Sequence, residues 1–469
     1  MQITPIGFIY ILLTLFFIFR RKKVFENLFL LCLMTDLFVE AGFVITIGST
    51  IVPYYDYCAY ILFFVCLTKY IKSPSSLPPI LKKLNFCYIF PLFLIVVFPS
   101  EAWVADGRTV LWDEVFLEGR RPVHPTVTIL VLKTTLKFIF SSFIAFWVYR
   151  NYVVSDYKHI LIKASRLINV FLCIGLFEYV FKNFLGGNII WGDFAESVLG
   201  TSSSTAFEGR LRGATYELTL FTKEASHYSY ALFLCLIIKF GKNILIRKKD
   251  GVSFSMLVCV ILMSLSTSFS TVLFLFAFVS LFLLHRWGIQ RPKKMHLEKL
   301  FFVAMLFVGS GGVMAYIANA DGAIWGRLSN MFDNWETFVD IENQDAMGDN
   351  STFVRILSVL QTFVAFSTRP LFGLSLNAAV CHGATAMLFS GIGLIGVFCW
   401  TKYYYYTTPL YQMVSPSKYL YFVCVIIYLL VNLLNSLDLR PFYDTTLLTI
   451  IVSFNFIFSS YTRKSIWLK

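Results

Sequence analysis

The sequence predicts an all-α fold: a polytopic helical membrane protein with about 12–13 transmembrane helices and long loops on one side. Three observations support this prediction. Of the 469 residues, 57% are hydrophobic and 14% are charged, whereas soluble proteins carry about 25% charged residues. Apolar windows long enough for membrane helices recur from one end of the chain to the other. Basic residues gather in short clusters between these windows.

The first span is expected at residues 5–19. Its apolar core is followed by the basic cluster Arg20 to Lys23, whereas a secretory signal peptide carries its positive charge before the apolar core. We therefore interpret this segment as a retained helix. At about 20 residues per span, the apolar windows give about thirteen spans. They cover residues 5–19, 27–50, 55–71, 86–99, 127–149, 164–184, 226–240, 252–266, 269–285, 300–319, 384–400, 418–434 and 445–460.

The net charge of +13 indicates topology rather than nucleic-acid binding. With the N-terminus outside, every later basic cluster falls on one side, which is cytoplasmic by the positive-inside rule. These clusters are Arg20 to Lys23, Lys82 to Lys83, Lys242 to Lys249, Arg286 to Lys299 and Arg463 to Lys469. Acidic residues concentrate in the loops of the other side, at residues 100–126, 185–225, 320–383 and 435–444.

The chain is expected to form a single integral membrane domain over residues 1–469, without internal repeats or a separate soluble domain. The ten cysteines lie mostly singly in apolar runs and form neither a CxxC pair nor a disulfide framework. Two loops exceed the length usual for simple connections, at residues 185–225 and 320–383. Both carry Trp, Phe and Gly among their charges, so we expect ordered, functional structure in them.

The first long loop leads into a charged stretch, "GRLRGATYELTLFTKEASHYSYALF", from Gly209 to Phe233. Arg210 and Arg212 lie two residues apart, and paired guanidinium forks bind the oxygens of a diphosphate bidentately. Glu224 and His227 stand where the next span begins. An interfacial belt of salt bridges between these arginines and nearby glutamates is the other interpretation.

The second long loop ends in an expected amphipathic helix at residues 351–366, with Ser351 as its N-cap and Arg355 among its apolar residues. The sequence "RPLFG" then breaks the helix, and His382 precedes a glycine-rich span. Arg355 could instead snorkel to the interface, and His382 could be structural. No metal is expected, because the acidic pair in "DIE" at residues 340–342 suits a solvated loop better than a metal site.

Together these features resemble the O-antigen polymerase and ligase superfamily. The resemblance lies in the order of spans and loops, in the Arg, Gly and "E-x-S" element that opens one span, and in the later arginine-led helix, "P-L-x-G", histidine and glycine-rich span. Ala225 stands where the family often has Pro, and Gly383 where Asn is common. The resemblance implies a fold similar to the C-type glycosyltransferases in the bacterial inner membrane, with the active site in long periplasmic loops.

The resemblance also implies a function, which is the joining of undecaprenyl-diphosphate-linked repeat units into a surface polysaccharide such as O-antigen. Arg210, Arg212 and Arg355 would bind the diphosphate, and His382 or Glu224 would act as general base, with His227 as a further candidate. No cofactor is implied. The expected partners are the lipid-linked glycan donor and acceptor, membrane lipids and a protein that regulates chain length.

Two alternatives remain at this point. The closer one is an O-antigen ligase, which passes the same donor glycan to lipid A-core. The other is a flippase for the lipid-linked oligosaccharide, a transporter that would place charged residues inside its spans. Charged residues do occur in or near apolar segments, at Asp36, Glu40, Lys133, Lys137, Glu178 and Lys182.

Overall fold

The computed structural model describes part of the chain. The described residues are 2–20, 23–37, 43–47, 50–72, 87, 90–91, 94, 111–112, 122–123, 157–199, 208, 211–212, 215–216, 218–220, 222, 225–243, 252–266, 369–373, 389, 391–399 and 402. They are mostly helical, which confirms the helical class, while the number of membrane spans stays a prediction. The chain divides into two compact units.

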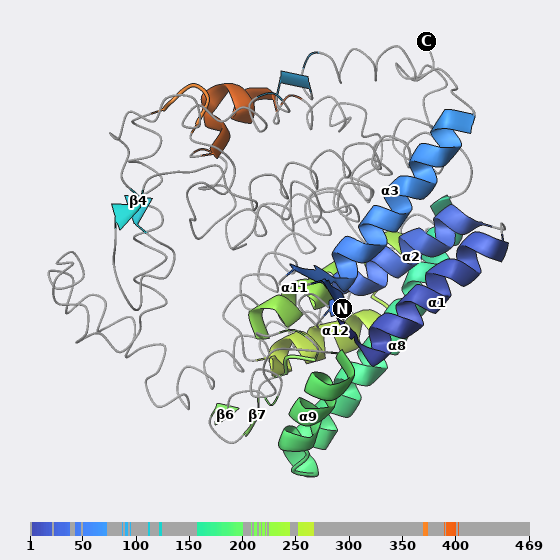
Figure 1. The fold of residues 1–469 in the computed structure, drawn as a ribbon. Helices are drawn as coiled ribbons and strands as arrows, with labels where there is room; N and C mark the ends of the chain where they lie inside the picture. The colour runs from blue at the N-terminus through green and yellow to red at the C-terminus, as the bar shows by residue number, and fades with distance from the viewer. Residues whose placement is uncertain are drawn as a thin grey trace, which may run out of the picture. The chain divides into compact units, whose positions relative to one another are not determined.

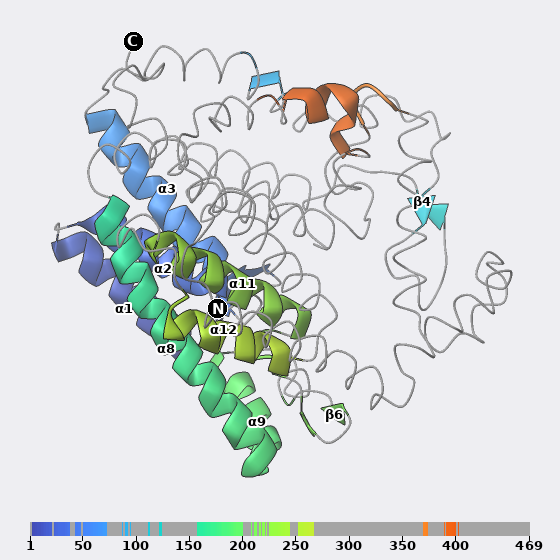
Figure 2. The same cartoon turned by 180° about the vertical axis from the view of Figure 1, so that it is seen from behind.

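The first unit contains the described helices from α1 to α12 together with most of the strands. Its helices are α1 (Pro5–Arg20), α2 (Val24–Leu37), α3 (Tyr54–Lys72), α8 (Tyr157–Phe184), α9 (Asn188–Leu199), α11 (Ala225–Lys242) and α12 (Phe254–Leu265). Helices α8, α11 and α12 contact one another in all three pairs, and α2 packs against α8 and α11. Figures 1 and 2 show α1, α2 and α8 side by side from opposite directions.

Helix α11 is the centre of this unit. Every residue from 231 to 240 is buried, as expected of a helix that is apolar on all sides. The outward surfaces of α1 and α8 are also apolar. Their exposed side chains include Phe8, Leu12, Phe16, Val170, Phe177 and Phe184. Both the core of this unit and the exposed surfaces of these two helices are therefore apolar.

Of the described helices, α8 is the one that is long and apolar enough to cross a membrane, over His159–Phe184. Shorter apolar helices cover Pro5–Arg20, Val24–Thr35, His227–Phe240 and Phe254–Leu265. Helix formation is thus confirmed where the sequence predicted spans at residues 5–19, 164–184, 226–240 and 252–266. The predicted span at residues 55–71 corresponds to helix α3.

The predicted span at residues 27–50 is wrong over its second half. Helix α2 ends at Leu37, and strands β2 (Phe43–Ile47) and β3 (Thr50–Pro53) follow it. They pair antiparallel, with Ile47 opposite Thr50, and β1 (Gln2–Ile3) adds to the far side of β2. The run is rich in β-branched residues, and a Gly-Ser pair separates its two halves. Such a sequence favours a hairpin with a two-residue connection.

The three-stranded sheet closes against the start of α1. Thr4 is the N-cap of α1, because its hydroxyl accepts a 2.9 Å hydrogen bond from the Gly7 amide, and Pro5 takes the first helical position, where proline is favoured. A side chain at Gly7 would overlap the Val44 backbone. The Tyr54 hydroxyl lies 3.1 Å from the Thr4 hydroxyl and donates to the Leu199 carbonyl. The starts of α1 and α3 and the end of α9 therefore lie together.

Basic residues gather around the end of α1 and the start of α8, and we call this part of the unit the basic end. Here the Lys163 ammonium lies 2.7 Å from the Glu26 carboxylate, and His159 lies 2.9 Å from it. Lys239, near the end of α11, donates to the Ser165 carbonyl. The basic end therefore contains the end of α1, the starts of α2 and α8 and the end of α11.

The second unit is described over fewer residues. Strands β4 (Leu111–Trp112) and β5 (Pro122–Val123) pair antiparallel within the predicted loop 100–126. Residues 369–373 form a turn, as the proline and glycine of "RPLFG" predict. A helical segment follows at residues 391–399.

Gly175 tests the packing between α8 and α11. A methyl group at this position would overlap the Tyr228 hydroxyl, which is buried and has no hydrogen-bond partner among the described residues. We expect Gly175→Ala to destabilise the protein by about 1–3 kcal/mol through overpacking. Tyr228→Phe alone should have little effect, since the lost hydroxyl makes no hydrogen bond.

The double variant Gly175→Ala/Tyr228→Phe should recover most of the loss, because the overlapping atom is gone. Thermal unfolding of the detergent-solubilised protein measures all three variants. Additive losses in the double variant would contradict this packing.

Candidate functional site

The charged stretch identified from the sequence contains a buried segment of irregular backbone, which lies between a short hairpin and helix α11. Strands β6 (Leu211–Arg212) and β7 (Thr215–Tyr216) form a short hairpin, and the chain then runs into the helical bundle before α11 begins at Ala225. Leu218, Thr219, Leu220 and Thr222 are all buried. We call residues 218–222 the anchored segment. Its peptide groups need hydrogen-bond partners, because buried irregular backbone has no helix or sheet to satisfy them.

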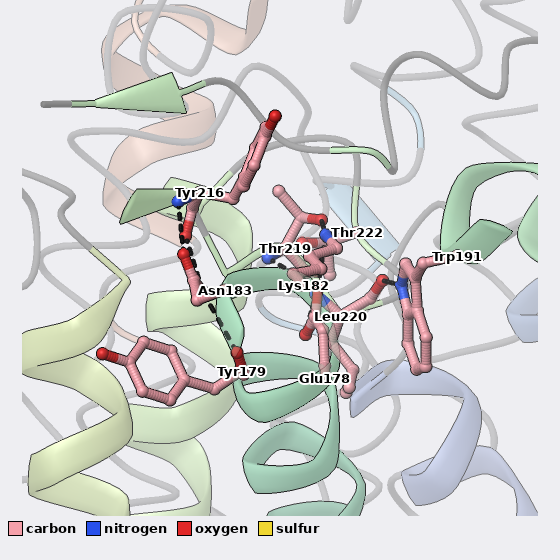
Figure 3. A network of polar contacts seen from close by, with 9 residues as sticks. All are labelled: Glu178, Tyr179, Lys182, Asn183, Trp191, Tyr216, Thr219, Leu220 and Thr222. Carbon is pink, nitrogen blue, oxygen red and sulfur yellow. Dashed lines mark hydrogen bonds and ion pairs between the residues drawn. The ribbon is translucent and has the colours of Figure 1, made fainter. Parts of the chain in front are cut away.

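A carboxylate from α8 satisfies the amides of the anchored segment (Figure 3). The Leu220 amide donates to both oxygens of Glu178, at 2.9 and 2.8 Å, and the Thr219 amide donates to Oε1 at 3.3 Å. Glu178 therefore acts as a substitute for the carbonyls of a regular element. Charge-assisted hydrogen bonds of this kind are stronger than neutral ones.

Lys182 neutralises that carboxylate. Its ammonium lies 2.7 Å from Glu178 Oε1, and both side chains are completely buried. The two residues are four positions apart on α8, which places them on one helical face. Lys182 also donates to the Thr219 hydroxyl at 3.3 Å. A buried charge of one sign would be strongly unfavourable alone, so the pair and the anchored segment depend on each other.

Two carbonyl groups of the anchored segment also accept hydrogen bonds (Figure 3). The indole N–H of Trp191, on α9, donates to the Leu220 carbonyl at 3.2 Å. The Thr219 carbonyl accepts from the amide and the hydroxyl of Thr222, at 2.8 and 2.6 Å. Helices α8 and α9 thus hold the segment from two directions.

Leu220 has a φ of 49°, in the left-handed region that residues with a side chain seldom adopt. Its amide is held by Glu178 and its carbonyl by Trp191. Backbone in such a conformation persists only where its surroundings fix it, and it is concentrated at functional sites. The anchored segment is therefore held against its own conformational preference.

Asn183 extends the contact to the hairpin (Figure 3). Its side-chain oxygen accepts a 2.6 Å hydrogen bond from the Tyr216 amide, and its side-chain nitrogen lies 3.5 Å from the Tyr216 carbonyl. Leu211 pairs with Tyr216, and Arg212 pairs with Thr215. The backbone of Arg212 is therefore tied through the hairpin to the end of α8.

The predicted site residues fall unevenly on the described structure. Arg212 is in β6, and its backbone alone is described; His227 is in the first turn of α11 and is half-buried. The remaining predicted residues lie outside the described residues; they are Arg210, Glu224, Arg355 and His382. Arg212 and His227 belong to the segments on either side of the anchored segment. Whether Arg355 and His382 approach them stays a prediction.

The role of the α8 residues does not follow from the sequence alone. Glu178 and Lys182 appear there as charges in or near an apolar segment, and no motif marks Asn183 or Trp191. A glutamate four residues before a lysine was the available indication, since that spacing favours an ion pair on one face of a helix. The partner segment at residues 218–222 has no comparable pattern, so its place beside α8 could not be predicted.

The turn before His382 in the sequence contacts the helical segment that follows it. The turn at residues 369–373 packs against the helical segment at 391–399, where the Leu394 amide donates to the Pro370 carbonyl at 2.9 Å. Gly373 has a φ of 72° and lies so close to the Gly391 backbone that no side chain would fit. The "PLFG" turn and the glycine-rich segment are thus in contact.

Within the described part of the chain, no group of three His, Cys, Asp or Glu side chains is placed to hold a metal ion. The weak acidic pair at residues 340–342 lies outside it. Comparison of the chain with family models, with curated proteins and with solved structures finds no match.

The interdependence of the buried pair can be measured with a double-mutant cycle. Lys182→Met leaves the Glu178 carboxylate buried without its ammonium, so we expect a loss of about 3–5 kcal/mol in the free energy of unfolding. The double variant Glu178→Gln/Lys182→Met leaves no buried charge and should lose less than Lys182→Met alone. Chemical denaturation in detergent provides the measurement.

The matched control is Lys163→Met, because Lys163 makes an ion pair of the same 2.7 Å length with Glu26, while the Lys163 side chain itself is 34% exposed. Its loss should be about 1 kcal/mol or less. Equal losses for the two lysine variants would contradict the described burial of the Glu178–Lys182 pair.

Proposed function

We propose that this protein is a glycosyltransferase that polymerises a surface polysaccharide, such as O-antigen, in the bacterial inner membrane. It would join undecaprenyl-diphosphate-linked repeat units on the periplasmic side. The observation that carries the proposal is the position of the hairpin that contains Arg212, which is tied to the end of α8 opposite the basic end.

The orientation follows from the charges at the two ends of the helices. Lysine-rich ends of membrane helices face the cytoplasm, and the basic end includes Lys163, Lys239 and the Arg20 to Lys23 cluster. Helix α8 has 28 residues and so extends about 42 Å, enough to cross a bilayer. The hairpin at its other end would then face the periplasm, where lipid-linked repeat units are joined.

The arginines suit the leaving group of the proposed reaction. A hydroxyl of the acceptor glycan attacks the anomeric carbon of the donor, the bond from that carbon to the diphosphate oxygen breaks, and the lipid diphosphate leaves with the bonding electrons. Fixed guanidinium groups stabilise the negative charge that develops on it. We assign this role to Arg210, Arg212 and Arg355.

The proton of the attacking hydroxyl needs an acceptor. His382 and Glu224 are the candidates, and His227 is a further one; a positioned base contributes about 10²–10⁴-fold. The contact between the "PLFG" turn and the helical segment at 391–399 supports His382, since the stretch of sequence that contains this residue begins and ends at that contact. No cofactor enters this mechanism.

The buried ion pair favours an enzyme over the flippase alternative. A flippase would use charged residues in its spans to line a cavity for the polar headgroup. Glu178 and Lys182 are instead completely buried against each other and against the anchored segment. Their contacts support a scaffold for an external site.

The arginine assignment predicts a loss of function without a loss of protein. Arg210→Ala and Arg355→Ala should each lower turnover about 10²-fold or more, which would abolish long-chain polysaccharide on a gel of cell-surface glycans. Arg212→Lys should fall short of wild type, because an ammonium cannot replace a bidentate guanidinium contact. Immunoblots of the membrane fraction would verify insertion.

Arg166→Ala is the matched control, since Arg166 is an exposed arginine in the half of α8 toward the basic end. This variant should retain normal chains. Normal chain length in both Arg210→Ala and Arg355→Ala would refute the diphosphate assignment.

Purified protein given a lone lipid-linked repeat unit should produce a ladder of longer chains. A ligase would yield no product until lipid A-core is added, and a flippase would yield none in either case. A chelator should leave the ladder unchanged, because the arginines rather than a metal stabilise the leaving group. A requirement for Mg²⁺ would contradict this mechanism.

A further inference from the structure

Glu178 and Lys182 are ionised side chains without access to a substrate. Both are completely buried, so neither can touch a glycan or a diphosphate. Burial of charges is unfavourable unless it serves another purpose. The contacts of Glu178 indicate that purpose, because two of its hydrogen bonds reach the Leu220 amide and a third reaches Thr219.

We propose that Glu178 is a positioning residue, whose carboxylate, neutralised by Lys182, sets the place of the arginine-bearing hairpin and of the start of α11. The inference rests on the proposed function, because it assigns Glu178 to the diphosphate site that Arg210 and Arg212 would form. Its structural part, the anchoring of residues 218–222, can be tested without any glycan.

The anchored segment connects directly to the site residues on both sides. Before it, Arg212 and Tyr216 lie on the two paired strands of the hairpin, and the Tyr216 amide donates a 2.6 Å hydrogen bond to the side-chain oxygen of Asn183. After it, Glu224 follows Thr222 by two positions, and His227 is in the first turn of α11. A shift of the anchored segment would therefore move residues on both sides.

The backbone at Leu220 explains why removing one acceptor would have a large effect. Its φ of 49° is disfavoured for leucine. The hydrogen bond that its amide donates to Glu178 and the one that its carbonyl accepts from Trp191 hold it there. With the carboxylate gone, this residue can return to a common conformation. The hairpin would then lose its fixed relation to α8, and fixed donors stabilise a developing charge better than mobile ones.

Trypsin provides a direct measure, because its cleavage sites flank the anchored segment, after Arg210 and Arg212 on one side and after Lys223 on the other. Spheroplasts expressing the full chain would be treated with trypsin, and the fragments identified by mass spectrometry. Cleavage of a transiently opened segment follows the population of the open form. Hydrogen bonds to charged groups are strong enough that Glu178→Gln should raise the cleavage rate by about tenfold or more.

Glu26→Gln is the matched control. Glu26 is also a buried carboxylate with a lysine ammonium 2.7 Å away. It is on α2, however, and lies at the basic end, beside the start of α8. This variant should weaken the protein without changing cleavage after Arg210, Arg212 or Lys223. A general loss of stability would instead raise cleavage in both variants.

Polymerase assays on purified protein separate positioning from general stability. Glu178→Gln should lower kcat about tenfold and change the KM for the lipid-linked repeat less than about twofold, because a diphosphate clamp acts mainly in the transition state. Glu26→Gln should leave kcat unchanged. If Glu178→Gln is not recovered from membranes, Asn183→Ala replaces it, since that change removes the hydrogen bonds to Tyr216 and keeps the ion pair.

Faster cleavage together with a lower kcat would support the inference if both occur in Glu178→Gln, or in its replacement Asn183→Ala, and not in Glu26→Gln. An unchanged cleavage rate would overturn the anchor. Faster cleavage with a wild-type kcat would overturn the positioning role while the proposed function stands. Cleavage in inverted vesicles but not in spheroplasts, or no ladder from the wild-type protein, would overturn the proposed function, and the inference with it.

Discussion

The interaction between the Glu178 carboxylate and the Leu220 amide is the constraint on which the described site depends. Residues 218–222 are irregular backbone inside an apolar bundle, where water cannot satisfy peptide groups. A carboxylate with two oxygens can accept several amide hydrogen bonds at once, and the observed distances of 2.8 and 2.9 Å use both oxygens. The requirement for Lys182 follows, because an isolated carboxylate at this depth would be neutralised by a proton and would bind the amides less strongly.

This constraint also organises the longer-range structure. The indole N–H of Trp191, on α9, donates to the carbonyl of the same residue, Leu220. The end of α9 is held by Tyr54, which in turn contacts Thr4 at the start of α1. The end of the helices beside the anchored segment is therefore a continuous hydrogen-bonded layer that includes parts far apart in sequence. The basic end has a different character, with lysines that pair with Glu26 or donate to carbonyls of α8. The two ends of these helices therefore differ in the kind of polar contact that they contain.

The sequence predicts the helices well and the contacts between them poorly. Long apolar windows locate α1, α8, α11 and α12, because burial in core or lipid demands apolar residues throughout. The same criterion fails at residues 43–53, where β-branched residues are as apolar as a span but form strands. Glu178 and Lys182 are visible as charges, but the sequence does not reveal that their partner is the backbone of residues 218–222, since a peptide amide carries no residue-specific pattern. The arginines follow from their spacing and the resemblance alone, and Arg210, Arg355, Glu224 and His382 lie outside the described residues.

The division between a buried ion pair on α8 and a hairpin that carries Arg212 has a physical rationale. A guanidinium group that binds a diphosphate must be accessible, so it cannot be fixed by burial, and a hairpin of two-residue strands is marginally stable by itself. Rigidity must then come from a neighbouring element. The end of α8 supplies it through Asn183 at Tyr216 and through Glu178 at Leu220, which are five residues apart on the helix. A long helix packed in a bundle is a stiff support for a short hairpin that is not stable by itself.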